Sequence, residues 1–198
     1  SLAALYHDGI GCAASPEAAV FWARQAAEQG DVEAQAWLGH VLARGDGVPT
    51  DLAEAAAWNE RAAAAGSAAA ALNLGIQRIQ GQGVPADAAR ARALLQSAAD
   101  AGCAEAYYNL GAIYWKGWGV PADPAHAFAC FRKAHDLGCA QGTFAMGMLY
   151  GAGSGVPRDR AMAAAFFLAA AQTNHVGAQK QLGRMYLTAC GVPWSEQN

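Results

Sequence analysis

Histidine and cysteine are the residues of this chain with the widest chemical range, because they act as nucleophiles, proton carriers and metal ligands. The five histidines form no His-Glu-x-x-His motif and no pair at i and i+4, the spacing that places two zinc ligands on one helix face. No Cys-x-x-Cys pair and no Gly-x-Ser-x-Gly string occur, and the glycine-rich turns lack the Lys-Ser/Thr of a phosphate-binding loop. We therefore expect no catalytic residue, no metal site and no cofactor, and a chain that is not an enzyme.

Those glycine-rich turns recur at intervals of 36 residues. The string GDGVP occupies residues 45–49. Strings with the same glycines, valine and proline begin at residues 81, 117 and 153, and the string ACGVP begins at residue 189. A fixed period of this size is typical of a stacked repeat array. We predict a single array over residues 1–198, with repeats at approximately 1–33, 34–69, 70–105, 106–141, 142–177 and 178–198.

Each repeat contains the signals of two helices. The first helix carries a Leu-Gly pair and a large residue four positions after the Leu, as in Leu110, Gly111 and Tyr114, and this spacing places both large side chains on one face. The Gly on that face is expected to let a neighbouring helix approach closely. The Gly-x-Gly-Val-Pro turn ends the first helix, and an Asp two residues after the Pro, such as Asp123, is the expected N-cap of the second.

These residues resemble the Sel1-like repeat, a relative of the tetratricopeptide repeat, over essentially the whole chain. Residues 106–114, AYYNLGAIY, match the family pattern closely, whereas Arg78 stands where the pattern has Tyr. The resemblance implies an all-α fold, a right-handed superhelical α-solenoid of about six 36-residue helix-turn-helix repeats. It also implies that the first helices line a concave surface.

The positions expected to face the concave surface are apolar and aromatic in the middle of the array and basic at its edges. Trp115 is expected to be exposed, because its equivalents are as varied as Ala43, Gly151 and Leu187. Trp118, a large residue in a turn of variable sequence, is a second candidate anchor for a partner. The expected partner-binding residues are Leu72, Asn73, Ile76, Tyr108, Asn109, Trp115, Phe144 and Met148, with Arg44 and Lys116 among the basic residues.

An alternative remains open for several of these residues. Tyr108 and Phe144 could equally pack between neighbouring first helices as core. Asn73 and Asn109 are expected about 10 Å apart on adjacent helices, which would let them contact the backbone of an extended peptide at every third residue. Each amide could instead satisfy a backbone group of its own protein.

Composition restricts the class of partner. The formal net charge is −3 and no block of Lys and Arg occurs, so nucleic acid and anionic membrane surfaces are poor candidates. Hydrophobic residues make up 54% of the chain, but many are alanine and no run is long enough to span a bilayer. We expect a protein or peptide partner, no membrane insertion, and a monomer, with end-to-end self-association of the array as the alternative.

The cysteines leave the compartment open. Five cysteines are present, so at least one is unpaired within a monomer. Cys103 and Cys139 occupy equivalent repeat positions, and helices about 8–10 Å apart hold such residues too far apart for a disulfide. Reduced cysteines favour the cytoplasm, whereas the family resemblance slightly favours a bacterial periplasm or cell envelope. Leu2 and Ala3 match Leu38 and Gly39, so the chain is expected to begin inside a first helix.

The sequence thus predicts a non-enzymatic scaffold or adaptor that binds a partner protein or peptide in its concave groove. The alternative is an immunity or inhibitor protein that blocks a toxin or enzyme by tight one-to-one binding. An enzyme acting on β-lactams, an activity linked to some cysteine-rich relatives, is disfavoured because the chain lacks their regular disulfide pairing and a nucleophile constellation.

Overall fold

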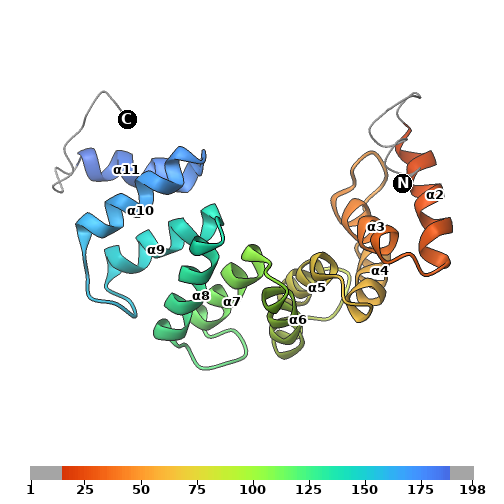
Figure 1. The fold of residues 1–198 in the computed structure, drawn as a ribbon, viewed down its shortest axis with the longest axis horizontal. Coiled ribbons are helices and arrows are strands. Elements are labelled where there is room, and N and C mark those ends of the chain that lie inside the picture. Colours follow the sequence, from red (N-terminus) through yellow and green to blue (C-terminus); the bar gives the residue numbers. More distant parts are fainter. Residues whose placement is uncertain (1–14, 188–198) are drawn as a thin grey trace. The chain divides into compact units, whose positions relative to one another are not determined.

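The computed structural model describes residues 15–187 of the chain, and this part contains ten α-helices and no strand (Figure 1). The predicted all-α repeat fold is confirmed. Short turns connect the helices. In each repeat the first helix has an odd number and the second helix has an even number. The helices are α2 Pro16–Glu28, α3 Val32–Arg44, α4 Leu52–Ala64, α5 Ala68–Gln80, α6 Ala88–Asp100, α7 Ala104–Lys116, α8 Pro124–Asp136, α9 Ala140–Ala152, α10 Arg160–Gln172 and α11 Val176–Leu187.

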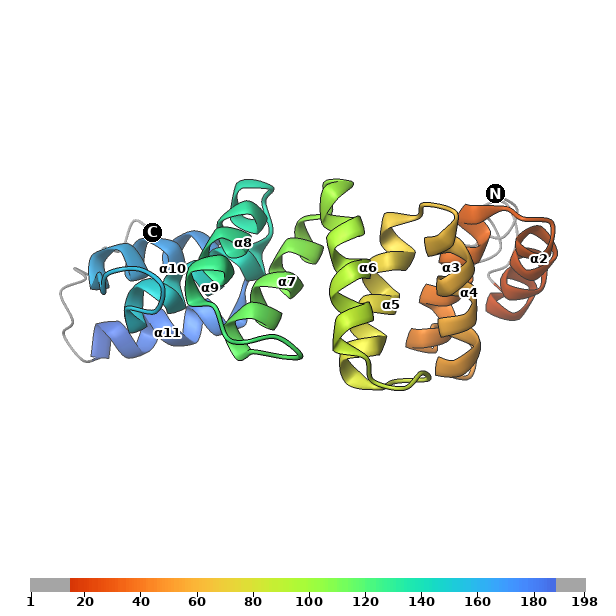
Figure 2. The same ribbon diagram turned by 90° about the horizontal axis from the view of Figure 1, so that it is seen from below.

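The chain divides into two compact units, Ser1–Cys103 and Ala104–Asn198. The first unit contains α2 to α6 and the second contains α7 to α11. Within each unit, consecutive helices lie side by side (Figure 2). The first helices of successive repeats also meet, as α3 with α5 in one unit and α7 with α9 in the other. Each unit is thus held together by helices that are close neighbours in the sequence.

The helix N-termini follow the prediction from the repeat. Asp51, Asp87, Asp123 and Asp159 each accept a hydrogen bond from the backbone N–H three residues later, at 2.9 to 3.0 Å. These carboxylates satisfy amide groups that have no partner inside the helix. The second helices α4, α6, α8 and α10 therefore begin where the sequence places them.

The glycine of the Leu-Gly pair provides room for the second helix of the same repeat, as expected. A β-carbon built on Gly111 would lie 2.6 Å from the Phe131 ring, and one on Gly147 would lie 2.6 Å from the Phe167 ring. Real β-carbons essentially never come this close. The bare backbone at these glycines therefore lets an aromatic ring of the second helix pack directly against the first.

One buried contact between α4 and α5 is polar where later repeats are apolar. Asn59 is fully buried, and its Nδ2 donates to Oε1 of Gln77 at 3.1 Å. The Gln77 amide donates in turn to the carbonyl of Leu52 at 3.3 Å, whereas Oδ1 of Asn59 has no hydrogen-bond partner. The residues at the positions equivalent to Asn59 and Gln77 are Leu95 and Ile113 one repeat later, and Phe131 and Leu149 two repeats later; each of these four side chains is apolar and buried.

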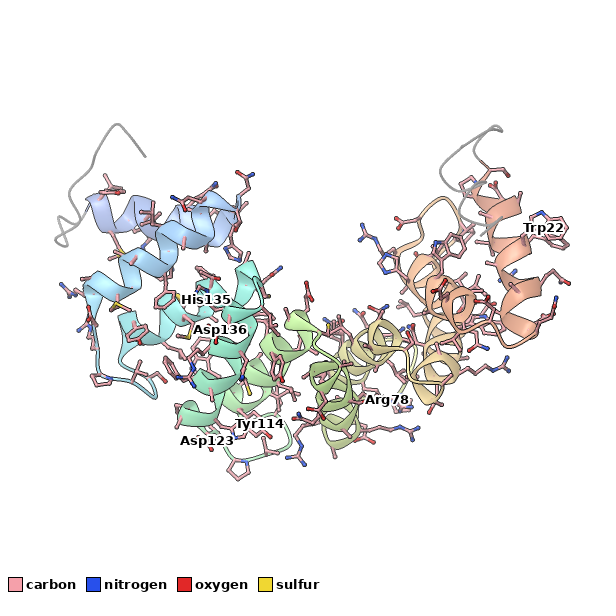
Figure 3. The ribbon with its side chains drawn as sticks, viewed as in Figure 1. Trp22, Arg78, Tyr114, Asp123, His135 and Asp136 are labelled. Atoms are coloured by element: carbon pink, nitrogen blue, oxygen red, sulfur yellow. The ribbon has the colours of Figure 1, made fainter. Side chains whose placement is uncertain are left out.

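The large residue four positions after the Leu of the Leu-Gly pair reaches the second helices. In the second unit the Tyr150 ring lies 5.9 Å from Phe128 of α8 and 5.5 Å from Phe166 of α10. Arg78, which departs from the aromatic pattern, instead places its guanidinium 3.7 Å from the Glu60 carboxylate (Figure 3). Leu42 occupies the same position in α3.

Candidate functional site

Three of the residues predicted to bind a partner line one cavity of the first unit. Arg44 of α3 lies there with Asn73 and Ile76 of α5. The cavity has a volume of about 190 Å³, and its other lining residues are His40, Ala43, Leu52, Gln77 and Gln82. Leu72 is half-buried and does not line it. The first helices of two successive repeats thus place their predicted binding residues around one depression.

The lining of this cavity suits a peptide backbone with short side chains. The Asn73 amide offers both a donor and an acceptor, and Ile76 and Ala43 supply apolar surface. Arg44 is exposed at the edge, where its Nε lies 3.2 Å from the Asp46 carboxylate. This arrangement can bind and orient a polar chain, but it contains no paired nucleophile and base.

In the second unit the predicted aromatic residues serve the packing of the protein itself. The rings of Tyr108 and Trp115 lie 5.8 and 6.3 Å from the ring of Phe131, which is among the largest fully buried side chains. Trp115 is therefore half-buried, and the expectation that it is exposed is wrong.

Phe144 and Met148 likewise pack within the second unit, Phe144 against its own repeat and Met148 against the next. The Phe144 ring stacks on His175 at 4.6 Å and lies 5.5 Å from the Phe167 ring. The sulfur of Met148 accepts a weak hydrogen bond from the Gln181 amide at 3.9 Å. Both residues are half-buried, so only part of each side chain is available to a partner.

The two asparagines of the predicted peptide clamp differ in their contacts. Nδ2 of Asn109 donates to the carbonyl of Glu105 in its own helix at 2.8 Å, as the alternative from the sequence allowed. Asn73 lines the cavity of the first unit. The two residues belong to different units, so their spacing stays a prediction.

Lys116 and Trp118 form a contact at the turn that follows α7. The Lys116 ammonium lies 4.8 Å from the centre of the Trp118 ring, a cation–π distance. Trp118 is 40% exposed, and this exposure keeps it available as the turn anchor predicted from the sequence.

Three titratable side chains of the second unit, those of His135, Cys130 and Tyr108, contact or are buried among other residues of the protein. Nδ1 of His135 lies 2.9 Å from Oγ1 of Thr143, and its ring meets Phe166 edge-on at 5.2 Å (Figure 3). Burial, and secondly the nearby Asp123 carboxylate, raises the pKa of the Cys130 thiol to about 11. Burial, and secondly Cys139, raises the pKa of Tyr108. Both groups thus stay protonated at neutral pH and are poor nucleophiles.

Two further searches concern only residues 15–187. No cluster of three or more His, Cys, Asp or Glu side chains in this part of the chain is arranged to hold a metal ion. No helix in the same part is both long and apolar enough to cross a membrane. The three cysteines described, Cys103, Cys130 and Cys139, carry thiols rather than disulfides, whereas Cys12 and Cys190 lie outside the described residues.

The sequence did not identify the glutamines of the cavity as binding residues. Gln77 is polar where its equivalents are Val41, Ile113 and Leu149, and this contrast was a usable signal. Gln82 occupies the variable position of the turn, and Trp118 is its equivalent one repeat later. Trp118 was selected from the sequence only because it is the larger residue.

The model of the Sel1 repeat matches this chain five times, over residues 1–31, 32–67, 68–103, 104–139 and 140–175. Each match from the second onward begins two residues before the repeat start chosen from the sequence. No match is found among curated proteins.

Solved structures agree with this match. A Sel1 repeat protein from Oxalobacter formigenes superposes with a TM-score of 0.93 at 28% identity, over 99% of this chain and 78% of that chain. The protein c5321, a protective antigen present in uropathogenic Escherichia coli strains and displaying an SLR fold, superposes with a TM-score of 0.83 at 29% identity. That match covers 96% of this chain and 41% of the longer antigen.

Proposed function

As this chain belongs to the Sel1 repeat family, whose members are generally protein-interaction scaffolds, we propose that it binds an extended segment of a partner protein on its first helices. The observation that carries the proposal is the cavity of about 190 Å³ between α3 and α5. Residues from two successive repeats meet there, so a segment that crosses from one repeat to the next contacts both helices.

The chemistry of the cavity suggests how such a segment is held. Asn73 hydrogen-bonds a backbone amide of the partner through its own amide, while Ile76 contacts an apolar side chain. Arg44, exposed at the edge and paired with Asp46 through Nε, can donate from its other guanidinium nitrogens to an oxygen of the partner. We propose that this site binds a partner and carries out no chemical reaction.

The test is affinity capture from a lysate of the source organism, followed by a binding titration of the captured partner. Asn73→Ala and Asn109→Ala form a matched pair, because they are the same substitution at equivalent positions of successive repeats. We expect Asn73→Ala to weaken binding about tenfold, since a lost hydrogen bond at a desolvated contact costs about 1.4 kcal/mol. Helical circular dichroism must be unchanged in both variants.

The outcomes separate three situations. Loss of binding in Asn73→Ala alone supports the cavity between α3 and α5 as the site. Loss in both variants supports the two-amide clamp predicted from the sequence. Equal binding by both variants and the wild type overturns the proposal and moves the site away from the first helices.

The same titration distinguishes an adaptor from the alternative role. An adaptor is expected to bind several partners at micromolar affinity or weaker. A single partner bound one-to-one at about nanomolar affinity, together with loss of that partner's activity, would instead support an immunity or inhibitor protein.

A further inference from the structure

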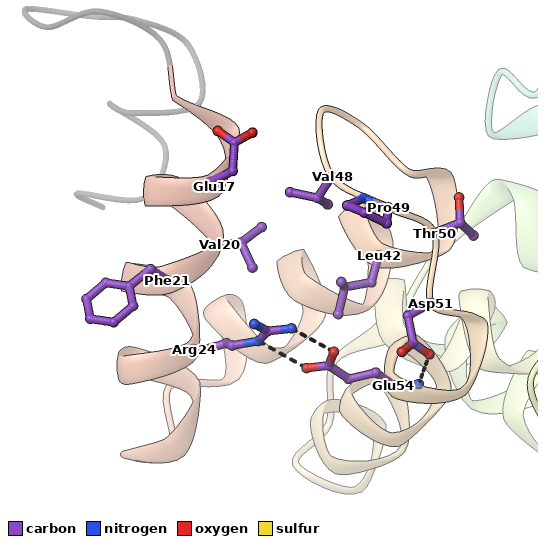
Figure 4. Close-up of a pocket in the computed structure, with 10 residues that line it drawn as sticks. All are labelled: Glu17, Val20, Phe21, Arg24, Leu42, Val48, Pro49, Thr50, Asp51 and Glu54. Carbon is purple, nitrogen blue, oxygen red and sulfur yellow. Dashed lines mark hydrogen bonds and ion pairs between the residues drawn. The ribbon is translucent and has the colours of Figure 1, made fainter.

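A second cavity of the first unit lies between α2 and the turn that joins α3 to α4 (Figure 4). Its volume is about 400 Å³, within the size range of small-molecule sites. Val20, Leu42 and Val48 give it an apolar lining, and Val20 and Leu42 are buried. This α2–α4 pocket shares no residue with the cavity of the proposed function.

The pocket exists because two aromatic rings found in a later repeat are missing here. Leu42 is equivalent to Tyr150, and Val20 is equivalent to Phe128. In the second unit those two rings pack edge to face at 5.9 Å, and Tyr150 also stacks on Phe166. The first unit has aliphatic residues at both positions, so neither ring is present beside the pocket.

An exposed aromatic pair borders the opening. Phe21 lines the pocket and is 55% exposed, although the equivalent residue of every later repeat is alanine. Trp22 beside it is 43% exposed, and the two rings meet edge to face at 5.3 Å. Exposed aromatic side chains next to a pocket are typical of the energetic centre of protein interfaces.

The charges around the pocket favour a basic ligand. Among the described residues of the lining, Arg24 is the only cation, and it donates to both carboxylate oxygens of Glu54, at 3.1 and 2.7 Å. Its charge is therefore neutralised by that pair. The carboxylates of Glu17 and Asp51, both on exposed residues, remain and give the lining a net negative charge.

We propose that the α2–α4 pocket binds a tyrosine side chain of a partner protein, flanked in the partner by lysine or arginine. The inserted ring takes the place that Tyr150 holds in its own repeat and packs on Val20 and Phe21. The flanking cations face Glu17 and Asp51. This contact lies apart from the first-helix cavity, so one molecule offers two separate sites to partners.

The test uses three tripeptides, acetyl-Lys-Tyr-Lys-amide, acetyl-Lys-Ala-Lys-amide and acetyl-Glu-Tyr-Glu-amide, titrated into the whole chain. The methyl NMR signals of Val20 and Val48 report occupancy of the pocket. We expect the first peptide to shift these signals and to bind at least about tenfold more tightly than the other two, because each lacks either the ring or the complementary charge.

Two variants test the same contact from the protein side. Leu42→Tyr restores the ring found at this position in later repeats, so the protein should stay folded and lose at least about tenfold in affinity for the first peptide. Phe21→Ala introduces the residue of the other repeats and should weaken binding by about threefold or more. Leu137→Ala, which removes a 49% exposed leucine of the second unit, should change nothing and serves as the matched control.

Three results would overturn the proposal. Equal shifts with the alanine peptide would show that no ring is recognised, and undiminished binding by Leu42→Tyr would place the ligand elsewhere. A dimer in sedimentation velocity that disappears in Leu42→Tyr would identify a second copy of the chain as the occupant. The cavity between α3 and α5 is tested by Asn73→Ala, so failure of either proposal leaves the other standing.

Discussion

Gly111 shows how one missing β-carbon determines the spacing of two helices. Its neighbour Phe131 is almost fully buried, so the ring has no free space into which it can move. The same relation joins Gly75 to Leu95 and Gly147 to Phe167. The Leu-Gly pair of each repeat is therefore a packing requirement, and it is met at a cost in helix propensity.

Gly111→Ala is expected to destabilise the protein by about 1–3 kcal/mol, because the new methyl group overpacks a site that is already filled. Gly151→Ala is the control, since the atom nearest to its added β-carbon is the β-carbon of Ala163 at 3.7 Å, an ordinary contact distance. That variant should be neutral or slightly stabilising through helix propensity. Urea unfolding followed by circular dichroism measures both, and equal midpoints would contradict the packing account.

Asn59 and Gln77 form a hydrogen-bonded polar pair inside the first unit. Replacing only one of them leaves the other with a buried polar group and no partner, which costs about 1–3 kcal/mol. The double variant Asn59→Leu/Gln77→Ile introduces the apolar residues found at the equivalent positions one repeat later, Leu95 and Ile113. We expect it to be at least as stable as the wild type and more stable than either single variant. A double-mutant cycle without coupling would refute this account.

Among the features of individual helices, the N-caps are those that could be predicted best from the sequence. Asp123 accepts from the His126 amide at 2.9 Å, and Pro124 follows at the first helical position, where its missing N–H costs nothing. Asp123→Ala should destabilise the protein by about 1 kcal/mol, whereas Asp123→Asn keeps an acceptor oxygen and should cost much less. Thermal unfolding of the two variants separates capping from other effects.

The same carboxylate acts on the thiol of Cys130. Burial and this carboxylate raise the pKa of the thiol from 9.0 to about 11 in the folded protein. The contribution to stability is therefore complete below pH 9 and is lost between pH 9 and about 11, because the thiol ionises first in the unfolded chain. Asp123→Asn removes the second cause of the shift but leaves burial, so the pKa should fall only part of the way. We expect faster alkylation of Cys130 in this variant than in the wild type at pH near 9.5, measured by mass spectrometry; unchanged rates would exclude the effect of the carboxylate.

The sequence predicted features that depend on a few neighbouring residues. The cap at Asp123 and the close approach at Gly111 both follow from local spacing. The half-burial of Trp115 did not follow, because a helical phase assigns a face but does not show whether a neighbouring ring such as Phe131 reaches it. The α2–α4 pocket was missed for the same reason, since it results from small residues on separate helices.

At the scale of the molecule, each unit is built from contacts between helices at most two elements apart. Such local contacts allow parts of a repeat protein to open without the rest. Phe167→Ala, which empties a buried site in α10, should lower amide hydrogen-exchange protection in α9 to α11 more than in α7. A uniform loss of protection across α7 to α11 would show instead that the second unit opens only as a whole.

The polar pair of Asn59 and Gln77 limits how the chain could lengthen or shorten during evolution. The two residues belong to different sequence repeats, 32–67 and 68–103, so genetic excision of residues 68–103 would place Ile113 opposite Asn59 and bury an amide against a hydrocarbon. Excision of residues 140–175, within the second unit, would place Met185 where Leu149 packs near Phe131 and leave an apolar contact. Recombination between repeats of equal length is thus penalised at one joint of the array and tolerated at another.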